Sequence, residues 1–170
     1  MKLYSTKIPV IAADIIRKLK DDGDIEVSDP KEAQLDVEAV LKEYLRLDRE
    51  LTELAKDYME KRKLPYEQFG KIKRDLCEKR DFPTGEESLN YLATQIVEAF
   101  MHSKFIEEVF GDDVDMRRKM AATLRKHMQV DADIDHEVRR RIKNLEEGTA
   151  TWEVEYQRVM EQLRHQKKLD

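Results

Sequence analysis

The sequence repeats itself once along its length. Shifting it by 81 positions aligns the apolar residues of segment 11–19 with those of segment 92–100, and shifting it by 83 positions aligns Phe69 with Trp152. The offset grows by two, so the second copy carries two extra residues, which we place near residues 111–115. A repeat constrains the architecture strongly, because each copy has to supply the same set of secondary-structure elements.

A segment with turn-forming residues separates the two copies. Residues 81–85 read Asp-Phe-Pro-Thr-Gly, and Thr84 with Glu87 forms the spacing of a helix capping box. We therefore predict two fused helical repeats, residues 1–83 and residues 84–170.

The composition favours helices over sheets. Charged residues make up 41% of the 170 residues, and the chain contains only five glycines and four prolines. Sheets joined by many tight turns need more of both turn residues, whereas helices with wide solvated faces suit this balance. The predicted fold class is all-α.

Apolar residues at helical spacing predict about four helices in each repeat. In the first repeat they cover 8–19, 30–45, 48–63 and 69–77, and in the second 89–100, 116–128, 134–145 and 152–163. Asp29 precedes Pro30 as an N-cap signal, and Asp48 is expected to cap a separate third helix. Gly148 is expected to close the seventh helix. The short segments 25–27 and 105–110 are expected to be extended, and a small two-stranded pairing between them is one alternative.

Charge and cysteine content limit the functional classes. The formal net charge is −5, which gives no bulk positive field for nucleic acid or an anionic membrane. Cys77 is the only cysteine, so no intrachain disulfide is expected, and we interpret it as a small buried hydrophobe. The N-terminal residues lack the apolar core of a signal peptide, and no apolar run reaches the ~20 residues that span a bilayer. We expect a soluble cytoplasmic protein without a membrane partner.

No catalytic or metal-binding pattern stands out. Asp131, Asp133 and Asp135 have the spacing of a calcium loop, but His136 stands where the loop needs glycine and Ile142 where it needs glutamate. We interpret the three aspartates as residues that complement the positive end of the seventh helix. The four histidines and one cysteine show no metal spacing, and neither a glycine-rich phosphate loop nor a nucleophile elbow occurs. We expect no enzyme activity and no cofactor.

Basic clusters leave a nucleic-acid contact open. The residues that could hold phosphates are Arg117, Arg118, Lys119, Arg125, Lys126, Arg139, Arg140 and Arg141. Acidic residues interrupt these clusters, so a solvated helix face with salt bridges is the favoured interpretation. The neighbouring aromatic residues Tyr58, Tyr66 and Phe69 fit a core stripe better than a base-stacking platform.

The functional hypothesis that remains is protein binding. Methionines form adaptable surfaces on many helix-binding proteins, and the second copy carries Met116, Met120, Met128 and Met160. These four methionines could equally fill the core. We predict a non-enzymatic interaction or scaffold module with an unidentified protein partner, and RNA or DNA binding is the alternative.

The chain also resembles a known family. The similarity lies in Met1-Lys2-Leu3, Ala12-Ala13 and Ile25-Glu26 of the first copy, and in Ile134 and the segment 147–152 (Glu-Gly-Thr-Ala-Thr-Trp) of the second. These residues resemble the bacterial domain-of-unknown-function 507 family, here as a tandem duplication. The first copy departs from the pattern, because Pro65 to Phe69 stands where the family has glycine and tryptophan. The resemblance implies no catalytic residue, since the activity of the family is unassigned.

Overall fold

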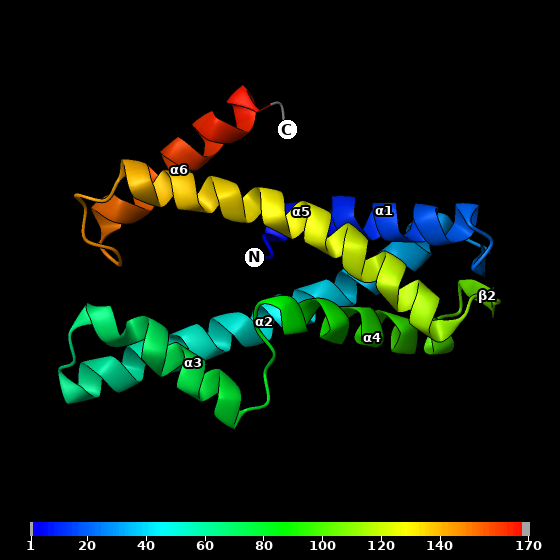
Figure 1. Ribbon diagram of the computed structural model, residues 1–170, viewed down its shortest axis with the longest axis horizontal. Coiled ribbons are helices and arrows are strands. Elements are labelled where there is room, and N and C mark those ends of the chain that lie inside the picture. The colour runs from blue at the N-terminus through cyan, green and yellow to red at the C-terminus, as the bar shows by residue number, and fades with distance from the viewer. Residues whose placement is uncertain (1, 168–170) are drawn as a thin grey trace.

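The computed structural model describes residues 2–167, apart from the side chains of residues 130 and 131, and is almost entirely helical (Figure 1). Its helices and strands are α1 (Ile8–Asp21), β1 (Ile25–Val27), α2 (Pro30–Arg62), α3 (Phe69–Lys79), α4 (Glu86–His102), β2 (Ile106–Val109), α5 (Asp113–Arg141) and α6 (Ala150–Gln166). Short 3-10 turns at Ser5–Lys7 and Tyr66–Gln68 precede α1 and α3. The order helix, strand, helix, helix thus occurs twice. The all-α prediction and the two-stranded pairing are both confirmed.

Equivalent side chains cap the long helices of the two copies. The Asp29 carboxylate accepts hydrogen bonds from the backbone N–H groups of Lys31 and Glu32 at the start of α2. The Asp112 carboxylate accepts one from the N–H of Asp115 at the start of α5. Asp29 and Asp112 are related by the 83-residue offset. An oxygen acceptor at this position satisfies first-turn donors that have no partner inside the helix.

The described part of the chain has three α-helices per copy, not about four. The predicted second and third helices are one helix of 33 residues, α2, and the sixth and seventh are one helix of 29 residues, α5. No glycine lies inside either helix, and an aspartate in a helix interior costs less than ~1 kcal/mol. Asp48 therefore caps nothing, and its carboxylate instead lies 2.8 Å from Nζ of Lys73 on α3.

The backbone of residues 131–135 lies inside α5, so these aspartates begin no helix, and the side chain of Asp131 lies outside the described residues. α5 ends at Arg141, several residues before Gly148.

One core holds both copies together. Helices α1 and α4, and the N-terminal halves of α2 and α5, form a central four-helix bundle with a single cluster of buried apolar residues. Its fully buried members include Ile11, Leu41, Ile96 and Leu124, two from each copy. The predicted boundary between residues 83 and 84 lies between α3 and α4, and the core extends across it.

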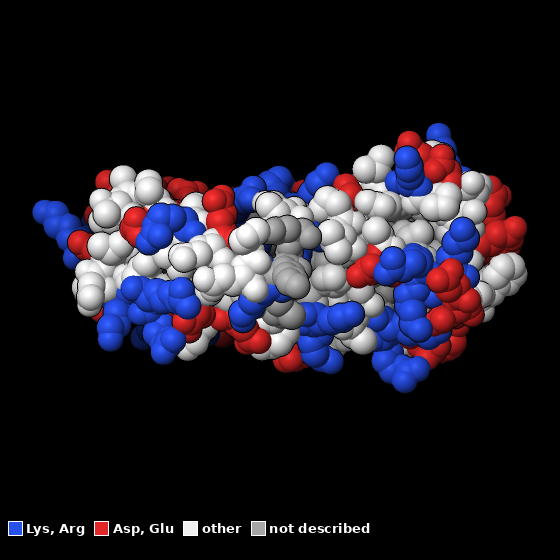
Figure 2. All heavy atoms as spheres, turned by 90° about the horizontal axis from the view of Figure 1, so that it is seen from above, with Lys and Arg blue, Asp and Glu red and all other residues white. Residues whose placement is uncertain are grey.

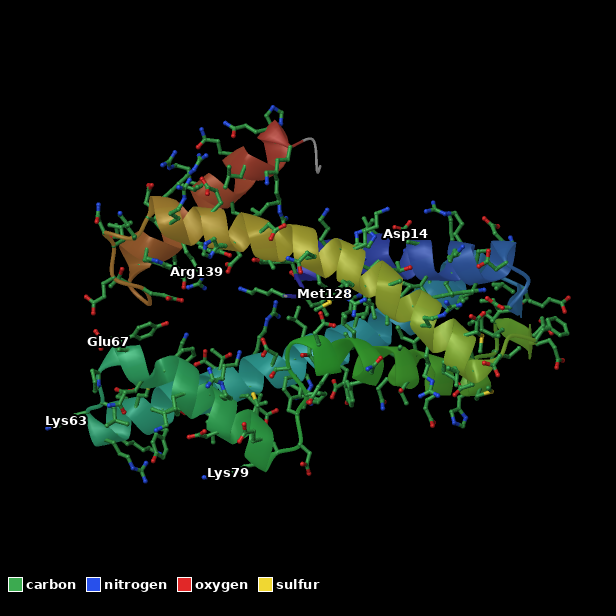
Figure 3. All side chains as sticks on the ribbon, viewed as in Figure 1. Asp14, Lys63, Glu67, Lys79, Met128 and Arg139 are labelled. Atoms are coloured by element: carbon green, nitrogen blue, oxygen red, sulfur yellow. The ribbon has the colours of Figure 1, made fainter. Side chains whose placement is uncertain are left out.

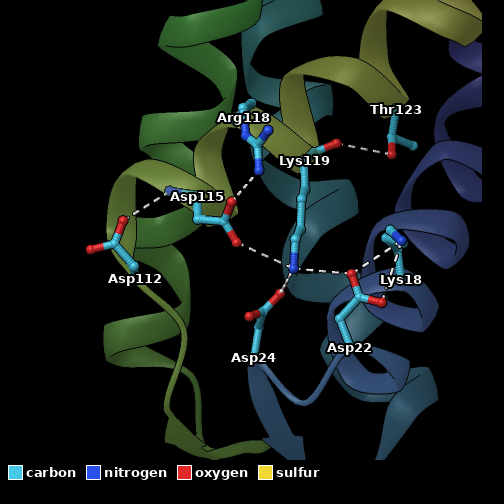
Figure 4. Close-up of polar contacts among 8 residues, drawn as sticks. All are labelled: Lys18, Asp22, Asp24, Asp112, Asp115, Arg118, Lys119 and Thr123. Carbon is cyan, nitrogen blue, oxygen red and sulfur yellow. Dashed lines mark hydrogen bonds and ion pairs between the residues drawn. The ribbon is translucent and has the colours of Figure 1, made fainter.

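Reciprocal polar contacts join the copies at the end of the bundle that carries the strands. The Ser103 hydroxyl, after α4, donates to Asp36 on α2. At the equivalent positions, Lys119 on α5 lies 3.0 Å from Asp22, after α1. Lys119 also reaches Asp24 at 2.7 Å and Asp115 at 3.4 Å (Figure 4). The hydrogen bonds that Lys119 donates to these carboxylates raise its pKa, so it stays charged.

Two arms extend from the bundle. Helix α3 packs on the C-terminal half of α2, and α6 packs on the C-terminal half of α5 (Figure 1). The α5–α6 arm has its own apolar cluster, which is distinct from the bundle core and contains Ile134, Val138, Ile142, Trp152, Tyr156, Val159, Met160 and Leu163. The two arms lie at one end of an elongated molecule, and the strands lie at the other.

The four methionines of the second copy considered above and the cysteine fill the interior. Met116, Met120 and Met128 belong to the bundle core and Met160 to the α5–α6 arm, and all four are buried. The adaptable methionine surface is therefore absent, and the core-filling alternative is correct. Cys77 is buried as predicted.

The sheet pairs like charges. In the antiparallel register, Ile25 faces Val109, Glu26 faces Glu108 and Val27 faces Ile106, so Glu107 is an extra residue in a bulge. Like charges directly opposite each other destabilise a sheet. The helical fold gains nothing from this arrangement.

Replacing Glu108 by lysine is expected to raise the free energy of unfolding by about 0.2–1 kcal/mol, because a cross-strand repulsion becomes an attraction. Urea denaturation followed by circular dichroism measures this change. Glu67→Lys, in the turn before α3, makes the same charge change far from the sheet and serves as control. Equal effects of the two substitutions would attribute the gain to net charge alone.

Candidate functional site in the cleft between the arms

A cleft separates the inner faces of the two arms. It has a volume of about 450 Å³ and continues toward the bundle into a second hollow of about 380 Å³. Both hollows are lined by Lys73 from one arm and Arg139 from the other. Figure 3 shows Arg139 directed from α5 into the space between the arms, with Met128 at the closed end of that space. Both arms, one from each copy, contribute side chains to the cleft.

The N-terminal segment forms the floor of the cleft. Leu3 is buried in the bundle core, and the hydroxyl of Tyr4 lies 3.2 Å from the hydroxyl of Tyr156 on α6. Nζ of Lys2 lies 5.0 Å from the ring centroid of Tyr4, within the range of a cation–π contact. An extended stretch of polypeptide thus already occupies the base of this site.

A charged and aromatic network forms the α5–α6 wall. Nε of Arg139 lies 3.1 Å from Asp135, and its Nη1 lies 2.8 Å from Glu147. The guanidinium also lies 5.3 Å from the ring centroid of Trp152. Burial raises the pKa of Asp135, but the hydroxyl of Tyr156 and the charge of Arg139 outweigh burial, and the pKa lies below its usual range. The ion pair is therefore formed at neutral pH.

The α2–α3 wall repeats this arrangement with different chemistry. Phe69 occupies the position equivalent to Trp152, and its ring stacks on Tyr66 with 5.5 Å between centroids. Lys73 occupies the position equivalent to Tyr156 and pairs with Asp48. Phe69 is half-buried and Tyr66 is 37% exposed, so this wall presents more open aromatic surface than the other. Sequence reasoning assigned both residues, together with the exposed Tyr58, to a core stripe, which was wrong for Tyr58 and Tyr66.

The pKa of the Tyr66 phenol depends on a carboxylate of the opposite arm. Burial raises this pKa to about 12, and the carboxylate of Glu147 on the other arm is the next cause. Glu147→Gln is expected to lower the pKa of Tyr66 toward 10, which an ultraviolet titration of the phenol measures against Tyr66→Phe. The phenol is neutral when protonated, so its contribution to stability is complete below pH 10 and is lost as the pH rises from 10 to 12. An unchanged pKa in Glu147→Gln would show that the arms are too far apart to interact.

The charges of the cleft are balanced. Five cationic side chains line it, namely Lys2, Arg49, Lys56, Lys73 and Arg139, and so do five carboxylates, namely Asp48, Glu53, Asp135, Glu147 and Glu153. Aromatic rings from both walls lie among them. A polyanion would meet as many negative as positive groups here.

The described part of the chain also contains no cluster of His, Cys, Asp and Glu that could hold a metal ion.

The basic residues predicted from the sequence lie along α5 and do not form one patch. Arg117 and Arg141 are 24 residues apart, about 36 Å along the helix. Seven of the eight residues form ion pairs: Arg117 with Asp113, Arg118 with Asp115, Lys119 with three aspartates, Arg125 with Glu86, Arg139 with Asp135 and Glu147, and Arg140 and Arg141 with Glu137. No ion pair of Lys126 occurs among the described residues. Figure 2 shows basic and acidic side chains interspersed over the visible face. Contact with nucleic acid stays a prediction for these residues.

Sequence reasoning missed the partners that give the cleft its chemistry. Tyr4, Tyr156 and Glu147 were not selected, because the apolar stripes and caps along the chain do not show which helices face each other. One signal was available in the repeat, which aligned Phe69 with Trp152.

None of the described helices combines the length and apolar character needed to cross a membrane.

Comparisons with known proteins give one family match. The model of a family described as "Protein of unknown function (DUF507)" matches residues 1–169. The match covers both copies and nearly the whole chain. No curated protein matches the sequence.

Proposed function

Because the chain belongs to the DUF507 family of proteins of unknown function, its role has to be sought in its own surfaces, and we propose that it is a non-enzymatic cytoplasmic protein-interaction module. In this proposal the cleft between the arms binds an extended polypeptide segment of a partner protein. The observation that carries the proposal is the lining of the cleft, where both arms contribute aromatic rings and both signs of charge.

The floor of the cleft indicates the chemistry of the bound segment. The chain's own residues 2–4 are extended there and place a cationic, an aliphatic and an aromatic side chain against the arms. Leu3 belongs to the bundle core, so the contacts with the α5–α6 arm come from Lys2 and Tyr4. We propose a partner segment of the same kind, extended and with cationic side chains next to apolar or aromatic ones. Its rings would stack on Tyr66 and Phe69, and its cations would meet Glu53 and Glu153. The remaining volume lies within the ~300–1,000 Å³ range of binding pockets.

Selection from random peptides displayed on phage tests this proposal, with the intact protein as bait. The selected peptides are expected to bind in solution and to lose at least about tenfold affinity for Tyr66→Ala, because central aromatic residues dominate binding. Tyr58→Ala is the matched control, since Tyr58 is 39% exposed and does not line the cleft. Peptides that bind both variants equally would place the binding site elsewhere.

A salt titration separates protein binding from nucleic-acid binding. Nucleic-acid affinity falls steeply between 50 and 200 mM salt when several phosphates are contacted. Binding of the proposed segment is expected to fall much less, because aromatic stacking contributes beside its few ion pairs. Capture of partners by the tagged protein, with and without nuclease, adds a second readout. Retention on immobilised RNA or DNA that is lost with salt, together with nuclease-sensitive capture, would contradict the proposal and favour the alternative.

A further inference from the structure

The two strands lie at the end of the molecule opposite the cleft (Figure 1), and large exposed apolar side chains follow the second strand along the chain. We call this part of the molecule the sheet-end surface and define it by Glu26, Glu107, Glu108, Phe110 and Val114. Phe110 and Val114 are each 66% exposed, and the three glutamates are exposed as well. Ile25 and Ile106 are buried, so the inner face of the sheet belongs to the core and the outer face is open.

The sheet-end surface contains a like-charge contact, which destabilises the sheet. Glu26 and Glu108 face each other across the strands, and the bulge adds Glu107 beside them. No ion pair in the described part of the chain involves any of these three glutamates. Large apolar side chains exposed together beside uncompensated charge are typical of interaction sites.

The difference in length between the two copies lies at this surface. Residue 27 aligns with 108 at offset 81, and Asp29 aligns with Asp112 at offset 83, so residue 28 faces the three residues 109–111. A two-residue insertion here covers either 109–110 or 110–111, and both include Phe110. Phe110 is therefore specific to the second copy. This location refines the position near residues 111–115 that the sequence predicts for the extra residues.

The backbone holds Phe110 in place. The N–H groups of Phe110 and Gly111 both donate to the carbonyl oxygen of Asp24, at 2.8 and 2.9 Å. A Cβ atom at Gly111 would lie 2.8 Å from Cγ of Met116, so only glycine allows this close approach. The phenyl ring is thus presented on a fixed turn, which lowers the ordering cost of binding.

The charge of this end is strongly negative. Residues 20–29 and 104–115 contain ten acidic residues and two lysines. Lys119 and Arg117 pair with four of the acidic residues, and Asp29 and Asp112 cap helices. The glutamates of the sheet-end surface are among those that remain, and Figure 2 shows acidic side chains gathered at the right-hand end, where Figure 1 places the strands.

From these observations we propose that the sheet-end surface docks a basic segment of a second protein partner. Lysine or arginine side chains of that segment pair with Glu26, Glu107 and Glu108, and its apolar side chains cover Phe110 and Val114. Because this surface and the cleft lie at opposite ends, the protein can hold two partners at once and so act as a bridge. The surface does not depend on the cleft proposal, which concerns other residues.

Labelled 12-residue peptides test the sheet-end surface by fluorescence anisotropy on the intact protein. One peptide alternates lysine with leucine, a second alternates lysine with serine, and a third alternates glutamate with leucine. The lysine–leucine peptide is expected to bind at least about tenfold more tightly than the other two, because both the charge and the apolar contact are needed. Phe110→Ser and the double variant Glu107→Gln/Glu108→Gln are each expected to weaken this binding at least about fivefold.

Matched controls keep the test specific. Val154→Ser removes an equally exposed apolar side chain from α6, and Glu60→Gln/Glu67→Gln removes two exposed charges from the other end. Both controls, and Tyr66→Ala in the cleft, are expected to leave the affinity of the lysine–leucine peptide unchanged within about twofold. Loss on Tyr66→Ala would place the peptide in the cleft and overturn the proposal.

Two further outcomes would also overturn it. Equal binding of the lysine–serine and lysine–leucine peptides would show that only the negative charge of this end attracts them and that Phe110 and Val114 contribute nothing. Calcium-dependent shifts in the nuclear magnetic resonance signals of Glu107 and Glu108, without peptide binding, would make it a cation site. All of these substitutions lie on exposed side chains, so unchanged thermal unfolding of each variant shows that the fold is intact.

Discussion

Each copy produced alone, as residues 1–83 or residues 84–170, is expected to show no cooperative unfolding transition. In the intact chain, α1 and α2 pack against α4 and α5 around one apolar cluster, so a single copy would expose half of the bundle core to water. A chain of about 80 residues that loses half its core cannot offset the entropy of ordering its backbone. Urea denaturation followed by circular dichroism measures the transition, and mixing the two halves is expected to restore it.

Equivalent core substitutions provide the matched control in the intact chain. Leu41 and Leu124 occupy equivalent positions and are both fully buried. Leu41→Ala and Leu124→Ala are each expected to lower the free energy of unfolding by about 2–5 kcal/mol within a single transition. Two separate transitions, or a sharp transition in either isolated half, would show that the copies are independent domains.

The repeat and the cap signals made much of the fold predictable. The duplicated pattern predicted the same order of elements in both copies, with each long helix wrongly divided in two, and Asp29 marked the start of α2 correctly. The internal breaks at Asp48 and Asp131 were wrong, because aspartate favours caps but does not require them. The partner that accommodates Asp48 is Lys73, on another helix. A helix break predicted from one residue cannot anticipate such a contact.

The candidate site was less predictable than the fold. Several basic residues of α5 have acids three or four positions away, such as Arg117 with Asp113 and Arg140 with Glu137, so part of their neutralisation could be read from the sequence. The contacts of Lys119 with Asp22 and Asp24 could not, since those residues lie about 95 positions away. An apolar stripe shows which face of a helix is buried but not which helix covers it. The cleft between the arms depends on that missing information.

The α5–α6 arm is expected to open locally, at a lower free energy than the global unfolding of the chain, and Trp152 is the residue with which to show it. Trp152 is buried in the α5–α6 cluster, where its ring stacks on Tyr156 with 4.9 Å between centroids. Trp152→Ala is expected to lower the local stability of this arm by about 3–5 kcal/mol, the usual cost of removing a buried indole. Because the cluster is distinct from the bundle core, the loss should be confined to α6 and the end of α5.

Native-state hydrogen exchange of the backbone amides measures this local loss. In Trp152→Ala, the amides of α6 are expected to lose protection while those of α1 and α4 keep theirs. Phe69→Ala, at the equivalent position of the other arm, is the matched comparison, and it should cost less because Phe69 is only half-buried. An equal loss of protection in α4 would mean that the arm and the bundle unfold together. In that case the cleft would be a rigid feature of one cooperative unit, and its two walls could not adjust independently to a bound segment.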